Sequence, residues 1–132
     1  MSGKAHLSLI ERAKKARLNA FAPYSRFKVG AAVLSGSGKI YSGCNMENAS
    51  YGLTVCAERN AVAAMVAAGE REIMAVAVVT DLKTPASPCG ACRQVIAEFG
   101  PGAKIVMANL KGAVQVRSLS ALLPLQFKKQ KK

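Results

Sequence analysis

Apolar positions at the start of the chain follow helical spacing. Apolar residues three or four positions apart share one face of an α-helix. The members of this stripe, with lysine and arginine between them, are Leu7, Ile10, Ala13, Leu18 and Phe21. The pattern predicts an amphipathic helix over residues 4–21, ended by the break at Ala22-Pro23-Tyr24.

Short apolar runs then alternate with amphipathic or alanine-rich stretches. Residues 73–80 are nearly all apolar and partly β-branched, as expected of a strand covered on both faces. The predicted strands are 28–34, a partner near 40–41, 73–80, 104–108 and 114–117, and the further predicted helices are 56–68, 89–99 and a last turn at 119–123. This alternation favours an α/β sandwich with one sheet between helical layers.

The length and composition suit one ordinary domain. The chain has 132 residues, of which 51% are hydrophobic and 20% charged. We expect a single domain over 1–127 and a basic, disordered tail over 128–132. No apolar run approaches the roughly 20 residues that span a membrane, and the first residues lack the pattern of a secretory signal. A cytoplasmic protein without a membrane partner is therefore expected.

The charge is strongly positive. The formal net charge is +12, and the last five residues, KKQKK, contribute four lysines to it. A positive surface attracts polyanions, and any binding of nucleic acid is expected to be at most weak and charge-driven. The aromatic content is only 5%, with no tryptophan, which provides little material for a base-stacking surface.

Several catalytic classes are excluded or disfavoured by what the chain lacks. His6 is the single histidine, and Asp81 is the single aspartate. A metalloprotease helix with two histidines is therefore impossible, and a Ser-His-Asp hydrolase would need both residues in the right place. No Walker-type or GxGxxG phosphate loop occurs either. Cysteine remains as the candidate for chemistry.

The cysteines fall at the predicted starts of structural elements. Cys89 and Cys92, in the string PCGAC, begin one predicted helix, and Cys56 begins another. A helix N-terminus favours thiolate, the form that binds metal, and two cysteines at this spacing can share one zinc ion. Competing interpretations are disulfides, a thioredoxin-like redox pair, unligated core thiols, and a closed structural zinc site with Cys44 as fourth ligand.

Glu58 favours an open zinc site over a closed one. It follows Cys56 by two residues, in the string CAE. Zinc deaminases pair such a Cys-x-Glu or His-x-Glu element with Pro-Cys-x-x-Cys, and the glutamate moves protons without binding the metal. We therefore predict a zinc ion held by Cys56, Cys89 and Cys92, with Glu58 as the catalytic residue.

Three further segments surround this signature: PYSRFKVGAAV at 23–33, GCNMENASYG at 43–52 and LLPLQF at 122–127. With them, the chain resembles a small, homotetrameric, zinc-dependent cytidine deaminase over nearly its whole length. The resemblance implies a three-layer α/β/α sandwich with one mixed five-stranded sheet and one Zn²⁺ per chain. It also implies hydrolytic deamination of cytidine and 2′-deoxycytidine, in pyrimidine salvage.

The resemblance further implies roles for individual residues. Water activated at zinc would attack C4 of the base, and Glu58 would carry its proton to N3 and then to the departing amine. Arg59 would hydrogen-bond the ligand sulfurs. The implied substrate-binding residues are Phe27 beside the base, Asn45 and Glu47 on the ribose hydroxyls, the Ala57 N–H, the Ser87 carbonyl, and, across subunit interfaces, Ala49, Tyr51 and Phe127. A carboxylate at the 3′-hydroxyl would repel a 3′-phosphate and so favours free nucleosides.

Two alternative functions remain open. One is deamination of another cytosine nucleoside, such as blasticidin S, although a different sugar should change the NMENAS loop. The other is a nucleic-acid-binding module with a structural four-cysteine zinc. That module requires Cys44 to matter for zinc as much as Cys92 does, whereas the deaminase interpretation assigns Cys44 no ligand role.

Overall fold

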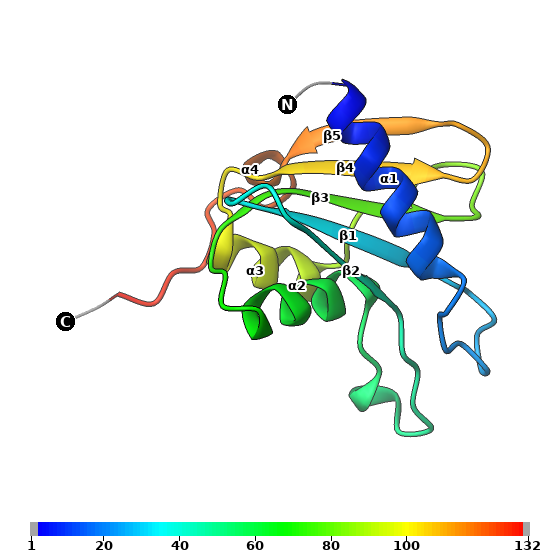
Figure 1. The fold of residues 1–132 in the computed structure, drawn as a ribbon. Coiled ribbons are helices and arrows are strands. Elements are labelled where there is room, and N and C mark those ends of the chain that lie inside the picture. The colour runs from blue at the N-terminus through cyan, green and yellow to red at the C-terminus, as the bar shows by residue number, and fades with distance from the viewer. Residues whose placement is uncertain (1–2, 131–132) are drawn as a thin grey trace.

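The computed structural model describes residues 3–130 and shows one sheet with helices on both faces (Figure 1). The strands are β1 Gly30–Ser35, β2 Ile40–Cys44, β3 Ile73–Thr80, β4 Lys104–Asn109 and β5 Val114–Ser118. The helices are α1 Gly3–Arg17, α2 Ala57–Ala67, α3 Gly90–Phe99 and α4 Leu119–Leu122, with a 3₁₀ turn η1 at Tyr51–Leu53.

The sheet is mixed, with strand order β2-β1-β3-β4-β5. Strands β3 and β4 are parallel, and the other three pairs are antiparallel. Because β3 and β4 run in the same direction, their connection must cross the sheet, and α3 makes that crossing. The predicted five-stranded mixed sheet is confirmed.

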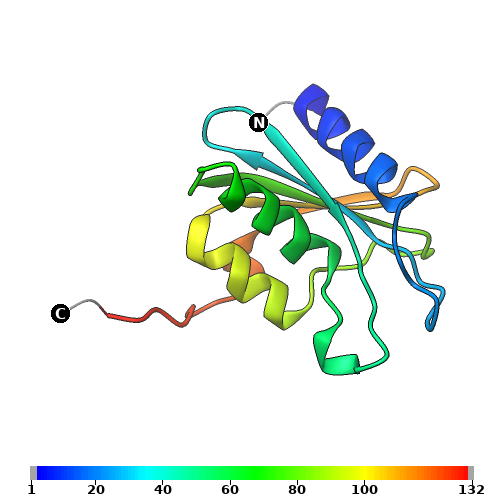
Figure 2. The same cartoon turned by 60° about the horizontal axis from the view of Figure 1, so that its bottom comes forward.

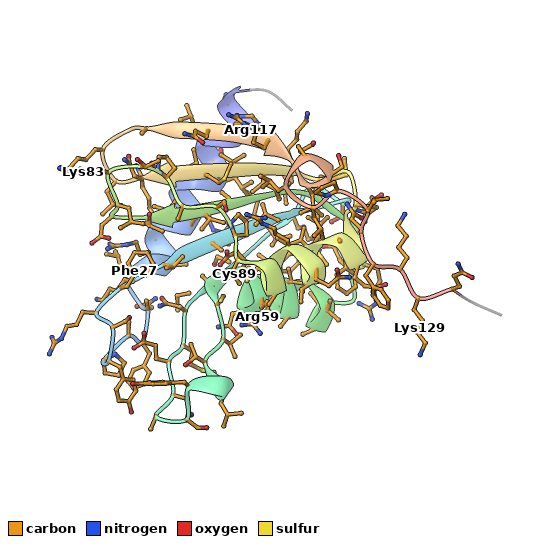
Figure 3. The ribbon with its side chains drawn as sticks, turned by 180° about the vertical axis from the view of Figure 1, so that it is seen from behind. Phe27, Arg59, Lys83, Cys89, Arg117 and Lys129 are labelled. Carbon is orange, nitrogen blue, oxygen red and sulfur yellow. The ribbon has the colours of Figure 1, made fainter. Side chains whose placement is uncertain are left out.

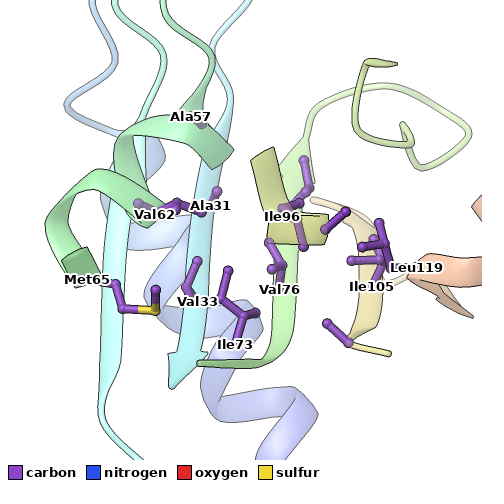
Figure 4. Close-up of a cluster of buried hydrophobic side chains, with 14 of the residues drawn as sticks. Ala31, Val33, Ala57, Val62, Met65, Ile73, Val76, Ile96, Ile105 and Leu119 are labelled. Atoms are coloured by element: carbon purple, nitrogen blue, oxygen red, sulfur yellow. The ribbon is translucent and has the colours of Figure 1, made fainter. Parts of the chain in front are cut away.

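The helices form a layer on each face of the sheet. Helix α1 lies on one face, and α2 and α3 lie side by side on the other (Figures 1 and 2). Each interface has its own hydrophobic core. Ile96, Val62 and Met65 fill the core beneath α2 and α3, which Figure 4 shows in close-up. Leu9 and Ile10 of α1 anchor the other core. The predicted α/β/α sandwich is therefore confirmed.

The apolar run at 73–80 forms the central strand β3. Seven of its eight residues are buried, and Met74 is the exception. Alternate residues of the strand contribute to the two cores, Val76 and Val78 to one and Ala75 and Ala77 to the other. The expectation of a strand covered on both faces is confirmed, because a central strand between two helical layers contacts solvent on neither.

The predicted first helix is four residues too long. Helix α1 ends at Arg17, and turns continue the chain through residue 20. Phe21 then joins an isolated bridge to Met46, in which its N–H donates to the Asn45 carbonyl at 3.0 Å. Leu18 and Phe21 are more than half exposed. Their apolar spacing continued the helical pattern, but pairing with the 45–47 segment decided the backbone instead.

The first hairpin is also displaced from its predicted bounds. Strand β1 begins at Gly30 instead of residue 28, and β2 continues to Cys44, beyond the partner strand predicted near 40–41. The register pairs Gly30 with Cys44 and Leu34 with Ile40, so the ladder extends along the whole length of β2. Backbone pairing with β1 determines where β2 ends, because the residues GCN at 43–45 have no strand pattern of their own.

Gly43 allows α2 to lie close to β2. A Cβ built on Gly43 would lie 2.5 Å from the Ala61 nitrogen and 2.8 Å from the Ala57 carbonyl oxygen. These are backbone atoms of the helix, so the contact tolerates no side chain at this position. The glycine therefore brings the N-terminal part of α2, and the residues it carries, against the sheet.

Among the described residues, no helix is long and apolar enough to cross a membrane. Residues 128–130 of the basic tail are exposed and have no regular secondary structure, whereas residues 131–132 lie outside the described chain. The division into a domain over 1–127 and a disordered tail stays a prediction.

Candidate active site

The ends of two neighbouring helices bring three cysteines together. Cys56 is the N-cap of α2, and Cys89 is the N-cap of α3. Cys92 lies in the first turn of α3 and is fully buried. The unpaired N–H groups of both helix starts therefore surround the sulfur atoms with partial positive charge, which favours thiolates.

The three sulfur atoms have the spacing of metal ligands. All three Sγ atoms lie within 4.8 Å of one another. Cys56 Sγ lies 3.9 Å from Cys89 Sγ, which in turn lies 3.5 Å from Cys92 Sγ. Tetrahedral zinc with Zn–S bonds of about 2.3 Å places its sulfurs about 3.8 Å apart. The residues present therefore fit Zn²⁺, with a fourth position left for another ligand.

Cys44 lies outside this group. It ends β2, and its carbonyl accepts a hydrogen bond from Asn60 Nδ2 at 2.8 Å. Its sulfur is not among the mutually close metal-ligating atoms that the described chain contains. The geometry thus favours the open three-cysteine site over the closed four-cysteine one.

The surroundings of Cys56 make its thiol strongly acidic. Hydrogen bonding from Cys92, followed by the guanidinium of Arg59, lowers the pKa of Cys56 to about 5, against the opposing effect of burial. The same hydrogen bond to Cys56, together with burial, raises the pKa of Cys92. A thiolate is therefore present at Cys56 at neutral pH, ready to bind a cation.

Arg59 lies against the sulfur cluster. Its Nη2 lies 3.5 Å from Cys56 Sγ, as a hydrogen-bond donor. Hydrogen bonding to Cys56 raises the pKa of Arg59, so the group stays charged. Its Nε is buried without a protein partner among the described residues. Figure 3 shows Arg59 on α2 and Cys89 at the start of α3. A fixed positive charge here offsets the excess negative charge of three thiolates on one divalent ion.

Glu58 is buried beside the sulfur atoms. Only 4% of its surface is exposed, and it occupies the first turn of α2. Burial raises its pKa to about 7, and the nearby Cys56 charge acts in the same direction. A carboxyl group with a pKa near 7 exchanges protons readily in either direction at neutral pH. It is therefore suited to proton transfer beside a metal.

A pocket of about 200 Å³ opens over this cluster. The predicted residues that line it are Phe27, Asn45, Cys56, Ala57, Glu58, Ser87 and Cys89. Five further residues line the pocket without having been predicted from the sequence, and these are Val29, Thr54, Val78, Thr80 and Ala86. Thr80 could have been identified from the sequence, because it is the polar residue at the end of the buried central strand. The pocket's apolar walls suit a flat, uncharged ring.

Asn45 and Glu47 have backbone partners in this structure. Asn45 Oδ1 accepts from the Val29 N–H at 2.9 Å, and its Nδ2 donates to the Phe27 carbonyl at 2.8 Å. Glu47 Oε1 accepts from the N–H groups of Tyr24 and Ser25, and its Oε2 accepts from the Ser25 hydroxyl. Asn45 lines the main pocket, while Glu47 lines an adjoining hollow with Tyr24 and Tyr51.

Three predicted binding residues lie outside the main pocket of the single chain. Tyr51, in η1, is 80% exposed, and Phe127 is 75% exposed. Ala49 is exposed in the same loop as Tyr51. Phe127 borders a separate hollow at the C-terminal end of the chain. Within one chain, therefore, the structure does not bring these three residues to the sulfur cluster.

Comparison with known proteins agrees with this geometry. The family model described as the cytidine and deoxycytidylate deaminase zinc-binding region matches residues 4–109. The chain belongs to this family. The match includes all three clustered cysteines and Glu58, so the expected enzyme class and the zinc cofactor are confirmed.

Individual relatives match nearly end to end. A protein of Sporosarcina psychrophila named cytidine deaminase is 51% identical over 123 residues, which is 92% of this chain and 90% of the relative. One of Halalkalibacterium halodurans with the same name is 52% identical over 120 residues, 90% of this chain and 91% of the relative. The crystal structure of cytidine deaminase from Burkholderia pseudomallei superposes with a TM-score of 0.89 at 51% identity, over 96% of this chain and 100% of that one.

Proposed function

We propose that this enzyme hydrolyses cytidine and 2′-deoxycytidine to uridine and 2′-deoxyuridine with release of ammonia, in pyrimidine salvage in the cytoplasm. The observation that carries this proposal is Glu58, buried on the wall of a mostly apolar pocket and two residues after Cys56 of the three-cysteine cluster. Relatives about half identical over almost the whole chain bear the name cytidine deaminase, which supports the choice of nucleoside.

Cys56, Cys89 and Cys92 hold one Zn²⁺ per chain in this proposal. Zinc, when bound, supplies a Lewis acid that makes a coordinated water more acidic. Glu58 takes a proton from the attacking water and delivers it to N3 of the base. It then takes the proton of the C4 hydroxyl and passes it to the exocyclic amine, so that C4 keeps the water oxygen as a carbonyl and loses ammonia. A pKa near 7 allows the same carboxyl group to act first as base and then as acid.

The pocket walls position the nucleoside. Phe27 packs beside the base, while the Ala57 N–H and the Ser87 carbonyl contact its polar edge. Asn45 and Glu47 bind the ribose hydroxyls with the hydrogen-bonding capacity that their backbone contacts leave free, since a carboxylate oxygen accepts more than one hydrogen bond. All five residues line the main pocket or the hollow that adjoins it, which supports this assignment.

The active unit in this proposal is a homotetramer with shared sites. Ala49, Tyr51 and Phe127 of one subunit contact the nucleoside bound by a neighbour. The large exposed areas of the Tyr51 and Phe127 rings support this arrangement, because aromatic rings at protein surfaces commonly mark interfaces. Sedimentation of the zinc-loaded protein distinguishes a tetramer from a monomer.

The decisive test is ammonia release from cytidine by purified, zinc-loaded protein, with Glu58→Gln as the matched variant. We expect rapid release from the unaltered protein. We expect a rate at least about 10³-fold lower from the variant, which should keep one zinc per chain. Failure of the unaltered, zinc-loaded protein to release ammonia from either nucleoside would contradict the proposal. Blasticidin S is then the substrate to examine.

A further inference from the structure

Arg93 connects the rim of the active-site pocket to the C-terminal segment. It follows Cys92 in α3 and is partly buried. Its Nε donates to the Pro88 carbonyl at 2.8 Å, and its Nη2 donates to the Ser87 hydroxyl at 2.7 Å. Its Nη1 donates to the Leu122 carbonyl at 2.9 Å. One guanidinium therefore satisfies three acceptors in two segments that are distant in sequence.

The first of these segments forms part of the pocket wall. Ala86, Ser87 and Cys89 line the pocket, and Pro88 between them is buried. The stretch 84–88 has no regular secondary structure. Within the described chain, the hydrogen bonds that reach this stretch from outside it come from Arg93. The Ser87 carbonyl is thus carried by a loop that has little other polar support, and this loop leads directly into Cys89, whose own carbonyl accepts from the Arg93 N–H at 2.9 Å.

The second segment is the chain end that follows β5. Leu122 closes α4, and the next α3 residue, Gln94, donates from Nε2 to the Phe127 carbonyl at 3.1 Å. The C-terminal segment therefore runs beside α3 (Figures 1 and 2). Helix α3 is packed into the core through Ile96. It provides a rigid base to which Arg93 can hold the loop.

We propose that Arg93 is a positioning residue for the deaminase reaction. It fixes the Ser87–Cys89 loop, so that the Ser87 carbonyl and the Cys89 sulfur keep their places relative to Glu58. This inference rests on the proposed function for its kinetic readout, but not for its effect on the metal site.

The chemistry at this position requires arginine. A guanidinium has five donors in a rigid planar fork and keeps its charge, whereas a lysine ammonium is a single nitrogen on a flexible stem. A lysine at residue 93 keeps the positive charge but cannot reach the Pro88, Ser87 and Leu122 acceptors together. Small displacements of groups around a metal or a substrate commonly cost one to two orders of magnitude in activity or metal affinity.

The test compares Arg93→Lys and Arg93→Met with Arg71→Lys and Arg71→Met. Arg71 is the matched control because its Nη1 also donates to two main-chain carbonyls, Val66 at 3.0 Å and Glu70 at 2.9 Å, in a turn that does not line the pocket. We expect both Arg93 variants to lose about 10–100-fold in kcat/KM for cytidine, with KM raised as well as kcat lowered. The Arg71 variants should stay within about threefold of the unaltered protein.

Zinc release to a chromophoric chelator is the second measurement, and it does not depend on turnover. We expect the Arg93 variants to release zinc about tenfold faster, since Cys89 directly follows the loosened loop. If the unaltered protein fails to deaminate cytidine, the proposed function fails, and the release rates alone decide the role of Arg93. Release rates and kcat/KM values that match those of the Arg71 variants would overturn the inference.

Ser87→Ala keeps the inference testable if the Arg93 variants do not fold. This change removes one of the three acceptors and leaves the main chain intact. We expect kcat/KM to fall about three- to tenfold and zinc release to accelerate in the same direction. A Ser87→Ala protein that is unchanged in both measurements contradicts the role assigned to the loop.

Discussion

The Asn45 side chain fixes the backbone at Phe27. Its Nδ2 donates to the Phe27 carbonyl at 2.8 Å, and its Oδ1 accepts from the N–H two residues later, at Val29. Asn45 is itself 92% buried, so water cannot easily replace either bond. The residue just before β1 is thus tied to the residue just after β2, and the aromatic wall of the pocket is fixed by this link.

Asn45→Ala should therefore be strongly destabilising. It leaves a part-buried N–H and a carbonyl without partners, which lowers the free energy of unfolding by about 2–4 kcal/mol. Urea denaturation measures this loss. Asn48→Ala is the matched control, because Asn48 Oδ1 accepts from the Ser50 N–H in an exposed loop, and it should cost less than about 1 kcal/mol. Equal losses of unfolding free energy in the two variants would show that the burial of Asn45 adds nothing to the stability that its hydrogen bonds provide.

Gly43→Ala should displace α2 from the sheet. The added Cβ meets the backbone of Ala61 and Ala57, which can yield only if the helix moves. We expect a loss of about 2–3 kcal/mol in unfolding free energy and weaker zinc binding, since α2 carries Cys56 and Glu58. Gly52→Ala is the control, as a Cβ there meets no atom within 4 Å. A Gly43→Ala protein as stable as the control would refute the close packing of α2.

Cys44→Ser and Cys92→Ser should differ in zinc content. Cys44 lies outside the sulfur cluster, so its variant should retain one zinc per chain after dialysis. Cys92 is fully buried within the cluster, and its variant should retain much less than one. Metal analysis of the two dialysed proteins gives the answer. Loss of zinc from Cys44→Ser would support the alternative interpretation, a closed zinc site with four cysteine ligands.

Glu58 should make the metal-free protein less stable as the pH rises. Burial raises its folded pKa from 4.5 to about 7, so between these values the folded state holds a proton that the unfolded state has released. The stability contribution is complete below pH 4.5 and is lost as the pH rises through 7, a change of about 3 kcal/mol. Glu58→Gln should flatten this part of the profile in chelator-treated protein. Parallel profiles for the two proteins would contradict the burial effect.

Local patterns predicted most elements of the fold. The 73–80 run gave the central strand because almost every side chain in it had to be apolar to contact both cores. The helical spacing gave a wrong prediction only where the backbone pairs with a distant segment of the chain. Phe21 fits the stripe of α1, but its N–H pairs with the Asn45 carbonyl, a contact 24 residues away that no local pattern contains.

Several residues of the site could likewise be identified from short sequence motifs. CAE and PCGAC each specify a cysteine at a helix start, so the ligands and Glu58 could be predicted from the sequence. The partners of Asn45 and Glu47 could not, because an amide or carboxylate in a loop looks the same whether it faces a sugar or a backbone N–H. The same holds for Arg93, whose acceptors are main-chain carbonyls and a hydroxyl without a distinctive pattern.

The sequence by itself determined the residue types at the candidate metal site, three cysteines and a glutamate, and the apolar runs that form the cores. Those properties depend on the spacing of a few neighbouring residues within one helix or strand. Only the tertiary structure decided that Cys56 and Cys89, 33 residues apart, meet at 3.9 Å while Cys44 stays outside. That outcome depends on α2 and α3 packing on the same face of the sheet with their N-terminal ends together. Such packing is a property of the whole core.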